Sequence, residues 1–236
     1  MISLDQALDR LLHRRSYLEA FLAGRVSELG VSEADLRALR SIDPAQLQRT
    51  AERVRADVLH RKHRGSGGLL SLYARTIDTW RAAHPEDHEL AELMSLFLES
   101  PAFDAYREHP HAGPGVCLEE AFFRFCDARK IGDGAILEAE FLTAMMKALV
   151  MSPRPDFALP AEVHAVPEGY FAVGERAGPT LYAAARGRLI LGPITPFLAD
   201  LLRAAEDPGE IARKHHVAMP VLRASLEHLA ELGLGR

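Results

Sequence analysis

The stretch GYFAVGERAGPTLYAAARGRLILGP, residues Gly169–Pro193, decides the fold of the last third of this chain. It contains three short runs of aromatic, β-branched and small apolar residues, separated by Gly178-Pro179 and Arg186-Gly187. Runs of about four to eight such residues between turn residues are typical of β-strands, and a two-residue turn joins antiparallel neighbours. The stretch therefore predicts three strands, and the third, Arg188–Leu191, is expected at an edge of the sheet with unpaired backbone groups.

Three helices are expected after these strands. They cover about Thr195–Ala205, Pro208–His215 and Met219–Leu232, and Gly-Leu-Gly follows the last one. Proline near a helix start and glycine after its end are the usual boundary signals. The order of three strands and three helices predicts a winged-helix-like (βββααα) C-terminal domain over residues 163–236.

The part of the chain before these strands has a different composition. Residues 1–151 carry apolar side chains at helical spacing without strand-like alternation, which predicts an all-helical domain. Ser152–Glu162, SPRPDFALPAE, has three prolines in eleven residues and predicts a proline-rich linker. We therefore expect an α+β protein with a helical partner-docking domain, the linker over residues 152–162, and the winged-helix-like domain.

Capping residues mark several helix starts in the first part: Ser3, Ser32, Asp43 and Asp133. The spacing predicts one helix from Leu4 to Leu22 and another from Leu69 to about Ala83. We also expect Pro85 to open a helix and Gly65–Gly68 to end one.

Composition narrows the classes of protein. The net charge is −5, so the whole chain is not a general polyanion binder. No apolar run is long enough to cross a bilayer, and the first fifteen residues are amphipathic, unlike a signal peptide. The two cysteines, Cys117 and Cys126, do not make a disulfide framework, so a cytoplasmic protein without a membrane partner is expected.

The last helix has the outline of a DNA-reading helix, but its charges argue against that role. Its outward face would carry one arginine, Arg223, and two glutamates, Glu227 and Glu231. A major-groove helix needs donors and positive charge beside the phosphates, so nucleic acid is an unlikely partner. An apolar helix face beside an edge strand is instead suited to adding a peptide strand. The sequence leaves open whether the Leu226 side or the Ser225 side of this helix lines such a groove.

The order GYFAVGE…TLYAAARGRLILGPITPFLADLLRAAEDPGEIARKHHVAMPVLRASLEHLAELGLG resembles a RiPP recognition element, a PqqD-like domain. RiPPs are ribosomally made, post-translationally modified peptides. In that family the leader of the precursor peptide pairs with the third strand and lies against the last helix. The resemblance implies a peptide-binding site made of these residues: Arg188, Leu189, Ile190, Leu191, Val221, Leu222, Ser225 and Leu229. The edge strand gives a specific prediction: Ile190→Pro should remove a pairing N–H and abolish leader binding without unfolding the helical domain.

The helical two-thirds is similar to the partner proteins of multinuclear non-haem iron oxygenases, such as those in 3-thiaglutamate and methanobactin-type pathways. This similarity implies a heterodimer in which the oxygenase holds the iron and performs the oxidation. The present chain would then have no cofactor, no metal and no catalytic residue of its own, and would deliver the precursor peptide.

Two alternatives remain open beside this interpretation: a winged-helix transcriptional regulator, and a metal-dependent enzyme that uses the helical domain. Asp57, His60 and His63 could share a helix face, but three cations lie between and after the histidines and would repel a metal ion. His109, His111 and Cys117 could converge, although their prolines and glycines fit a plain loop.

Overall fold

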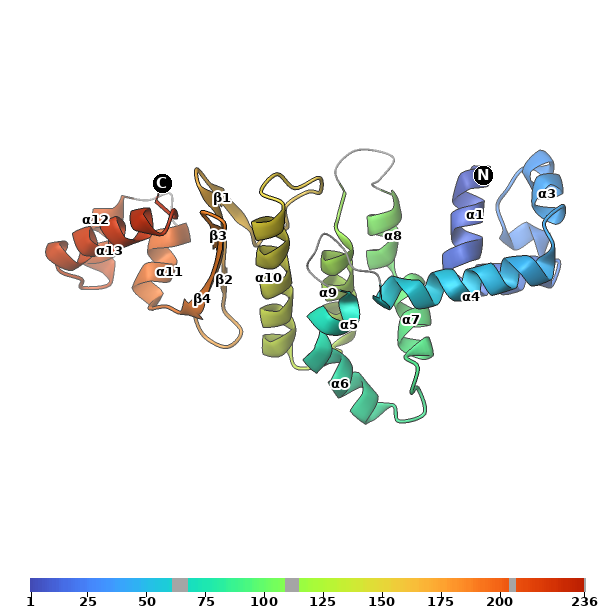
Figure 1. The fold of residues 1–236 in the computed structure, drawn as a ribbon, viewed down its shortest axis with the longest axis horizontal. Coiled ribbons are helices and arrows are strands. Elements are labelled where there is room, and N and C mark those ends of the chain that lie inside the picture. The colour runs from blue at the N-terminus through green and yellow to red at the C-terminus, as the bar shows by residue number, and fades with distance from the viewer. Residues whose placement is uncertain (61–67, 109–114, 204–206, 236) are drawn as a thin grey trace.

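The structure, a computed structural model, describes residues 1–60, 68–108, 115–203 and 207–235. The molecule is elongated, with the first helices at one end and the last helices at the other (Figure 1). Helices make up the first part, and a four-stranded antiparallel sheet with further helices makes up the last part. The expected α+β class is therefore confirmed.

The helical part begins with a small separate cluster and continues into a larger core. Its elements are α1 (Leu4–His13), α2 (Arg15–Leu22), the 3₁₀ turn η1 (Val26–Glu28), α3 (Glu33–Arg40), α4 (Pro44–His60), α5 (Leu69–Leu72), α6 (Ala74–Ala83), α7 (Ala91–Leu98), α8 (Pro101–Glu108), α9 (Leu118–Arg129) and α10 (Gly134–Met151). The first cluster buries Ala7, Leu11 and Leu47. The long helix α4 leads from this cluster to the main core, where Val58 and Leu59 are buried.

Stacked and tilted aromatic rings fill the main core of the helical part. Phe97 of α7 lies 5.1 Å from Phe122 and 5.3 Å from both Phe103 and Phe125, measured between ring centroids. Aromatic pairs at such distances add to the free energy of burial. These rings join α7, α8 and α9, and the same core also contains buried residues of α5, α6 and α10.

The sheet has the order β1-β2-β3-β4, with β1 (His164–Val166), β2 (Gly169–Gly174), β3 (Thr180–Ala185) and β4 (Arg188–Pro193). Both faces of its centre are covered. Tyr182 and Ala184 of β3 pack with the helical part, where α10 lies against the sheet, while Leu181 and Ala183 face a second core. That second core is closed by α11 (Pro196–Arg203), α12 (Pro208–Lys214) and α13 (Met219–Glu231). The layers are thus α10, the sheet and the three last helices (Figure 1).

The linker residues also join the helical core. Phe157 is buried there, and the N–H of Ala158 donates to the C=O of Gly115 at 3.1 Å. The helical and C-terminal parts therefore meet through a shared apolar layer.

Several local expectations hold in detail. Ser3, Ser32, Asp43 and Asp133 each accept a hydrogen bond from a backbone N–H in the first turn of the helix that follows. Most of the predicted break at residues 65–68 and most of the loop at 109–115 lie outside the described residues.

The predicted helix from Leu4 to Leu22 is wrong in one respect, because the chain is extended at Arg14 and divides it into α1 and α2. This break lets α2 dock on the end of α7. The N–H of Ser16 donates to the carboxylate of Glu99 at 2.9 Å, and Arg14 forms an ion pair with Asp104.

The predicted helix from Leu69 to Ala83 also divides, at Tyr73. The buried hydroxyl of Tyr73 donates to the C=O of Glu119 at 2.7 Å. The carboxylate of Glu140 then accepts the N–H groups of Arg75 and Thr76 at the start of α6. The interruption of the helix at Tyr73 therefore depends on polar partners that are distant in the sequence, Glu119 and Glu140.

Pro85 does not open a helix, contrary to expectation. The next helix, α7, begins at Ala91 after Leu90, which adopts the left-handed conformation at φ 59°. Asp87 lies in the loop before α7, farther from the helix start than a usual cap residue. Its carboxylate accepts hydrogen bonds from the N–H groups of Glu92 and Leu93 and caps the helix.

The sheet has one more strand than the three expected. The short strand β1 follows the linker and pairs with β2. Across the described residues, no helix is both long and apolar enough to cross a membrane.

Candidate functional site

The edge strand β4 is positioned by a tight hairpin. Its two loop residues, Arg186 and Gly187, have φ of 50° and 71°, and Ala185 pairs with Arg188. Two positive φ values in a two-residue loop define the turn whose twist matches a right-handed β-ribbon. Gly187 adopts this conformation without strain, and it fixes the register of the whole hairpin.

This register decides which backbone groups of β4 are available. The turn joins Ala185 to Arg188, and at the other end the N–H of Ile194 donates to the C=O of Pro179 at 2.9 Å. Hydrogen-bonded pairs alternate along an antiparallel ladder, so Ile190 also bonds to β3. The N–H and C=O groups of Leu189 and Leu191 therefore point away from β3, at the edge of the sheet.

The side chains of β4 present apolar surface on both faces. Ile190 is partly buried against the core formed with α11–α13. Leu189 and Leu191 are 37% and 46% exposed, on the face that carries Tyr182 and Ala184. An extended segment paired with β4 would find apolar neighbours for alternate side chains on either face.

A shallow groove of about 440 Å³ lies between α11 and α13. It is mostly apolar, and its lining residues are Leu198, Pro220, Val221, Ala224, Ser225, His228 and Leu229. Leu198 beside the groove and Ile190 of the edge strand pack on the same core, between the sheet and the last three helices. Val221, which is 53% exposed, leaves a large apolar side chain open to a ligand.

The structure distinguishes the two sides of α13 that the sequence leaves open. Leu222 and Leu229 form the buried stripe, and Ser225 lies on the flank that lines the groove. Leu226 is 39% exposed on the opposite flank and does not line the groove. The Ser225 side is therefore the one that faces the hollow.

The expected site residues fall into three groups. Arg188, Leu189, Ile190 and Leu191 follow one another along the edge, and Val221, Ser225 and Leu229 line the groove. Leu222 is only 3% exposed, so it supports the core beneath the groove and is not available to a ligand.

Three lining residues were not expected from the sequence. They are Leu198 of α11 and Pro220 and Ala224 of α13. The amphipathic pattern of α11 gives no sign of which of its apolar side chains meets α13, since that depends on how the two helices cross.

The charged residues near the turn before α13 are largely engaged by carboxylates. Lys214 and His215 both contact Asp200 at 2.8 Å, and Arg213 lies 3.5 Å from Glu210. The hydrogen bonds from Lys214 and His215 lower the pKa of Asp200. These pairs reduce the positive charge available to a phosphate backbone.

The structure describes only some of the residues considered for a metal: Asp57 and His60 of α4, and Cys117 before α9. Cys117 is buried with its sulfur 3.7 Å from that of Met145, and burial raises the pKa of the Cys126 thiol. Within the described ranges, no three His, Cys, Asp or Glu side chains form a group that could hold a metal ion. His63, His109 and His111 lie outside these ranges.

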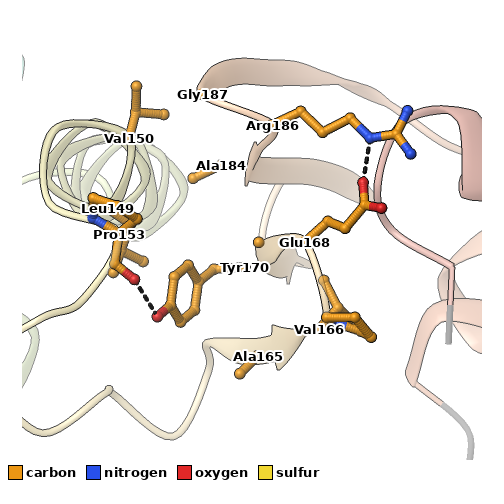
Figure 2. A pocket seen from close by; sticks show the side chains of 12 residues that line it. Leu149, Val150, Pro153, Ala165, Val166, Glu168, Tyr170, Ala184, Arg186 and Gly187 are labelled. Carbon is orange, nitrogen blue, oxygen red and sulfur yellow. Dashed lines mark hydrogen bonds and ion pairs between the residues drawn. The ribbon is translucent and has the colours of Figure 1, made fainter.

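A second hollow, of about 350 Å³, opens between the end of α10 and the sheet (Figure 2). Leu149 and Val150 lie on its helical side, and the ion pair of Arg186 with Glu168 lies across from them. The hydroxyl of Tyr170 donates to the C=O of Pro153 at 2.9 Å. This bond ties the start of the linker to β2, beside the hairpin that leads into β4.

Comparison with known proteins places the chain in no family: no family model, no curated protein and no solved structure matches it.

Proposed function

We propose that this chain binds an extended peptide, which adds a strand to the sheet at β4. The observation that carries the proposal is the open edge of β4, where Leu189 and Leu191 present unused N–H and C=O groups beside exposed apolar side chains. Backbone hydrogen bonds supply affinity in this mode of recognition, and apolar pockets for alternate side chains supply specificity. The groove between α11 and α13 is the pocket for the side chains on the Ile190 face.

The resemblance to a RiPP recognition element suggests which peptide this is. We propose the leader segment of a ribosomally made precursor peptide. The chain would be a non-catalytic, cytoplasmic partner protein, and its helical part would dock on a multinuclear non-haem iron oxygenase that holds the iron. The shared apolar layer between α10 and the sheet supports this arrangement, since it would keep a bound peptide at a fixed position relative to the helical part.

The exposed charges of α13 favour a peptide over DNA. Arg223, Glu227 and Glu231 are all exposed, so the outward face has more negative than positive charge. Such a face would be repelled by phosphates, whereas a neutral, apolar strand meets no such penalty.

Selection of displayed linear peptides on the full chain, followed by fluorescence anisotropy with a labelled binder, tests the proposal. Leu191→Pro removes an outward N–H and puts a ring in the path of the added strand, so we expect at least ~10-fold weaker binding. Leu191→Val keeps the N–H and an apolar side chain and is the matched control.

Equal binding by wild type, Leu191→Pro and Leu191→Val would refute strand addition, as would failure to select any linear peptide. Similarity of selected sequences to short reading frames beside the gene would support a precursor leader. If the chain bound duplex DNA and no peptide, that result would support the winged-helix transcriptional regulator instead.

A further inference from the structure

The helical part contains a hollow of about 610 Å³ that peptide binding at β4 does not use. Its lining residues come mainly from α2, α4 and α7. Figure 1 shows α4 and α7 in the helical part. Leu18, Leu59, Leu90 and Met94 are buried in its wall, and Leu22 is 42% exposed at its rim. The volume is within the range of about 300–1,000 Å³ that is usual for small-molecule sites.

Arg55 is a partly buried cation in the lining of this hollow. Its Nη1 atom is fully buried and has no hydrogen-bond partner among the described residues. Burial lowers the pKa of this guanidinium, and the positive charge of Arg15 adds to the effect, against the opposing influence of nearby carboxylates. A buried donor without an acceptor costs free energy, so the described part of the chain does not give Arg55 a complete set of hydrogen-bond partners.

The carboxylates near Arg55 accept hydrogen bonds from other groups. Glu19 accepts from Arg15 at 2.8 Å, and Glu52 accepts from Gln48 at 3.2 Å. Glu99 accepts from the N–H of Ser16 at 2.9 Å. Each of these bonds occupies one acceptor position of its carboxylate, and the Nη1 atom of Arg55 is left without an acceptor among the described residues.

We infer that this hollow binds a small amphipathic monocarboxylate, whose carboxylate accepts hydrogen bonds from Arg55 and whose apolar body lies against Leu59 and Met94. A guanidinium recognises a carboxylate through strong charge-assisted hydrogen bonds. The lining also includes Glu19, Glu52 and Glu89, so a ligand with several negative charges would be repelled. A protein partner would need about 800 Å² of surface, whereas the binding groups here converge inside one hollow.

Isothermal titration of the full chain with sodium octanoate tests this inference, with 1-octanol as the uncharged counterpart. We expect octanoate to bind with a millimolar or lower dissociation constant, and 1-octanol to bind at least ~10-fold more weakly. Arg55→Met should weaken octanoate binding at least ~10-fold and leave octanol binding nearly unchanged. Arg53→Met, at an exposed position on the same helix, should bind octanoate as the wild type does.

Thermal unfolding without ligand gives an independent measurement on the same variants. Arg55→Met removes the unpaired buried donor, so we expect the midpoint to rise by about 2–4 °C, a change that a purely structural arginine would not produce. Arg53→Met should leave the midpoint unchanged. Absence of octanoate binding at 5 mM would overturn the inference. So would equal octanoate binding by the Arg55→Met variant, or a lower melting midpoint for it.

Discussion

The alternation of backbone hydrogen bonds along β4 predicts that proline destabilises the hairpin strongly at Ile190 and only slightly at the neighbouring Leu191. Ile190 donates its N–H to β3, whereas the N–H of Leu191 points outward. Ile190→Pro leaves the C=O of Ala183 without its partner, which costs ~1–3 kcal/mol. It also removes part of a side chain that packs on the C-terminal core, which costs ~1 kcal/mol more. The sum is a loss of about 2–4 kcal/mol in the local stability of the hairpin.

Leu191→Pro removes no bond of the sheet. Its side chain is 46% exposed, and proline restricts the unfolded chain, so we expect a change within ~1 kcal/mol. The edge of a sheet is also where proline is tolerated. Our expectation from the sequence, that proline at Ile190 would selectively remove a donor for the peptide, therefore needs correction: Leu189 and Leu191 hold the donors that face an incoming strand.

Hydrogen exchange of β3, measured by mass spectrometry on the full chain, distinguishes the two variants. A loss of 2–4 kcal/mol corresponds to exchange about 30- to 1,000-fold faster for the amides opposite β4 in Ile190→Pro. Exchange in Leu191→Pro should stay within about fivefold of wild type. Similar acceleration in both variants, or a larger one in Leu191→Pro, would show that the register deduced for β4 is wrong.

Further predictions concern α13 and the cap of α7. Val221→Asp places a charge in the groove, so it should weaken peptide binding, measured by anisotropy, at least ~10-fold. Leu226→Asp, on the other flank of α13, should leave peptide binding unchanged. The reverse result would put the peptide on the Leu226 side. Burial alone would raise the pKa of Asp87, but hydrogen bonds from Glu92, Leu93 and Trp80 lower it overall, so the ionised form stabilises the fold above pH 3.8. Asp87→Asn should therefore unfold at lower urea concentration at pH 7, and its difference from wild type should shrink as the pH falls below 3.8; a constant difference would contradict this origin.

Local signals in the sequence were sufficient for most helix starts and for the β3–β4 hairpin. Ser3, Ser32 and Asp133 accept N–H groups within three residues, and Arg186-Gly187 closes a two-residue turn. These features depend on short-range sterics and on hydrogen bonds between near neighbours. Sequence patterns report them well for that reason.

Other features depend on contacts between distant parts of the chain. The interruption of the helix at Tyr73 is fixed by Glu119 and Glu140, and the division at Arg14 is accompanied by contacts with α7 and α8. No pattern within a single helix reports such partners. The position of Arg55 in a hollow between three helices is of the same kind.

Composition and periodicity were enough to place a helical first part, a proline-rich segment and a strand-rich stretch that ends at an edge strand. The packing of α10 on one face of the sheet and of α11–α13 on the other became visible only in the folded chain. The folded chain also shows that the Ser225 flank of α13, and not the Leu226 flank, lines the groove. Hydrophobic periodicity indicates that a helix has an apolar face. The width of the stripe that becomes buried depends on the angle at which the helix crosses its neighbour.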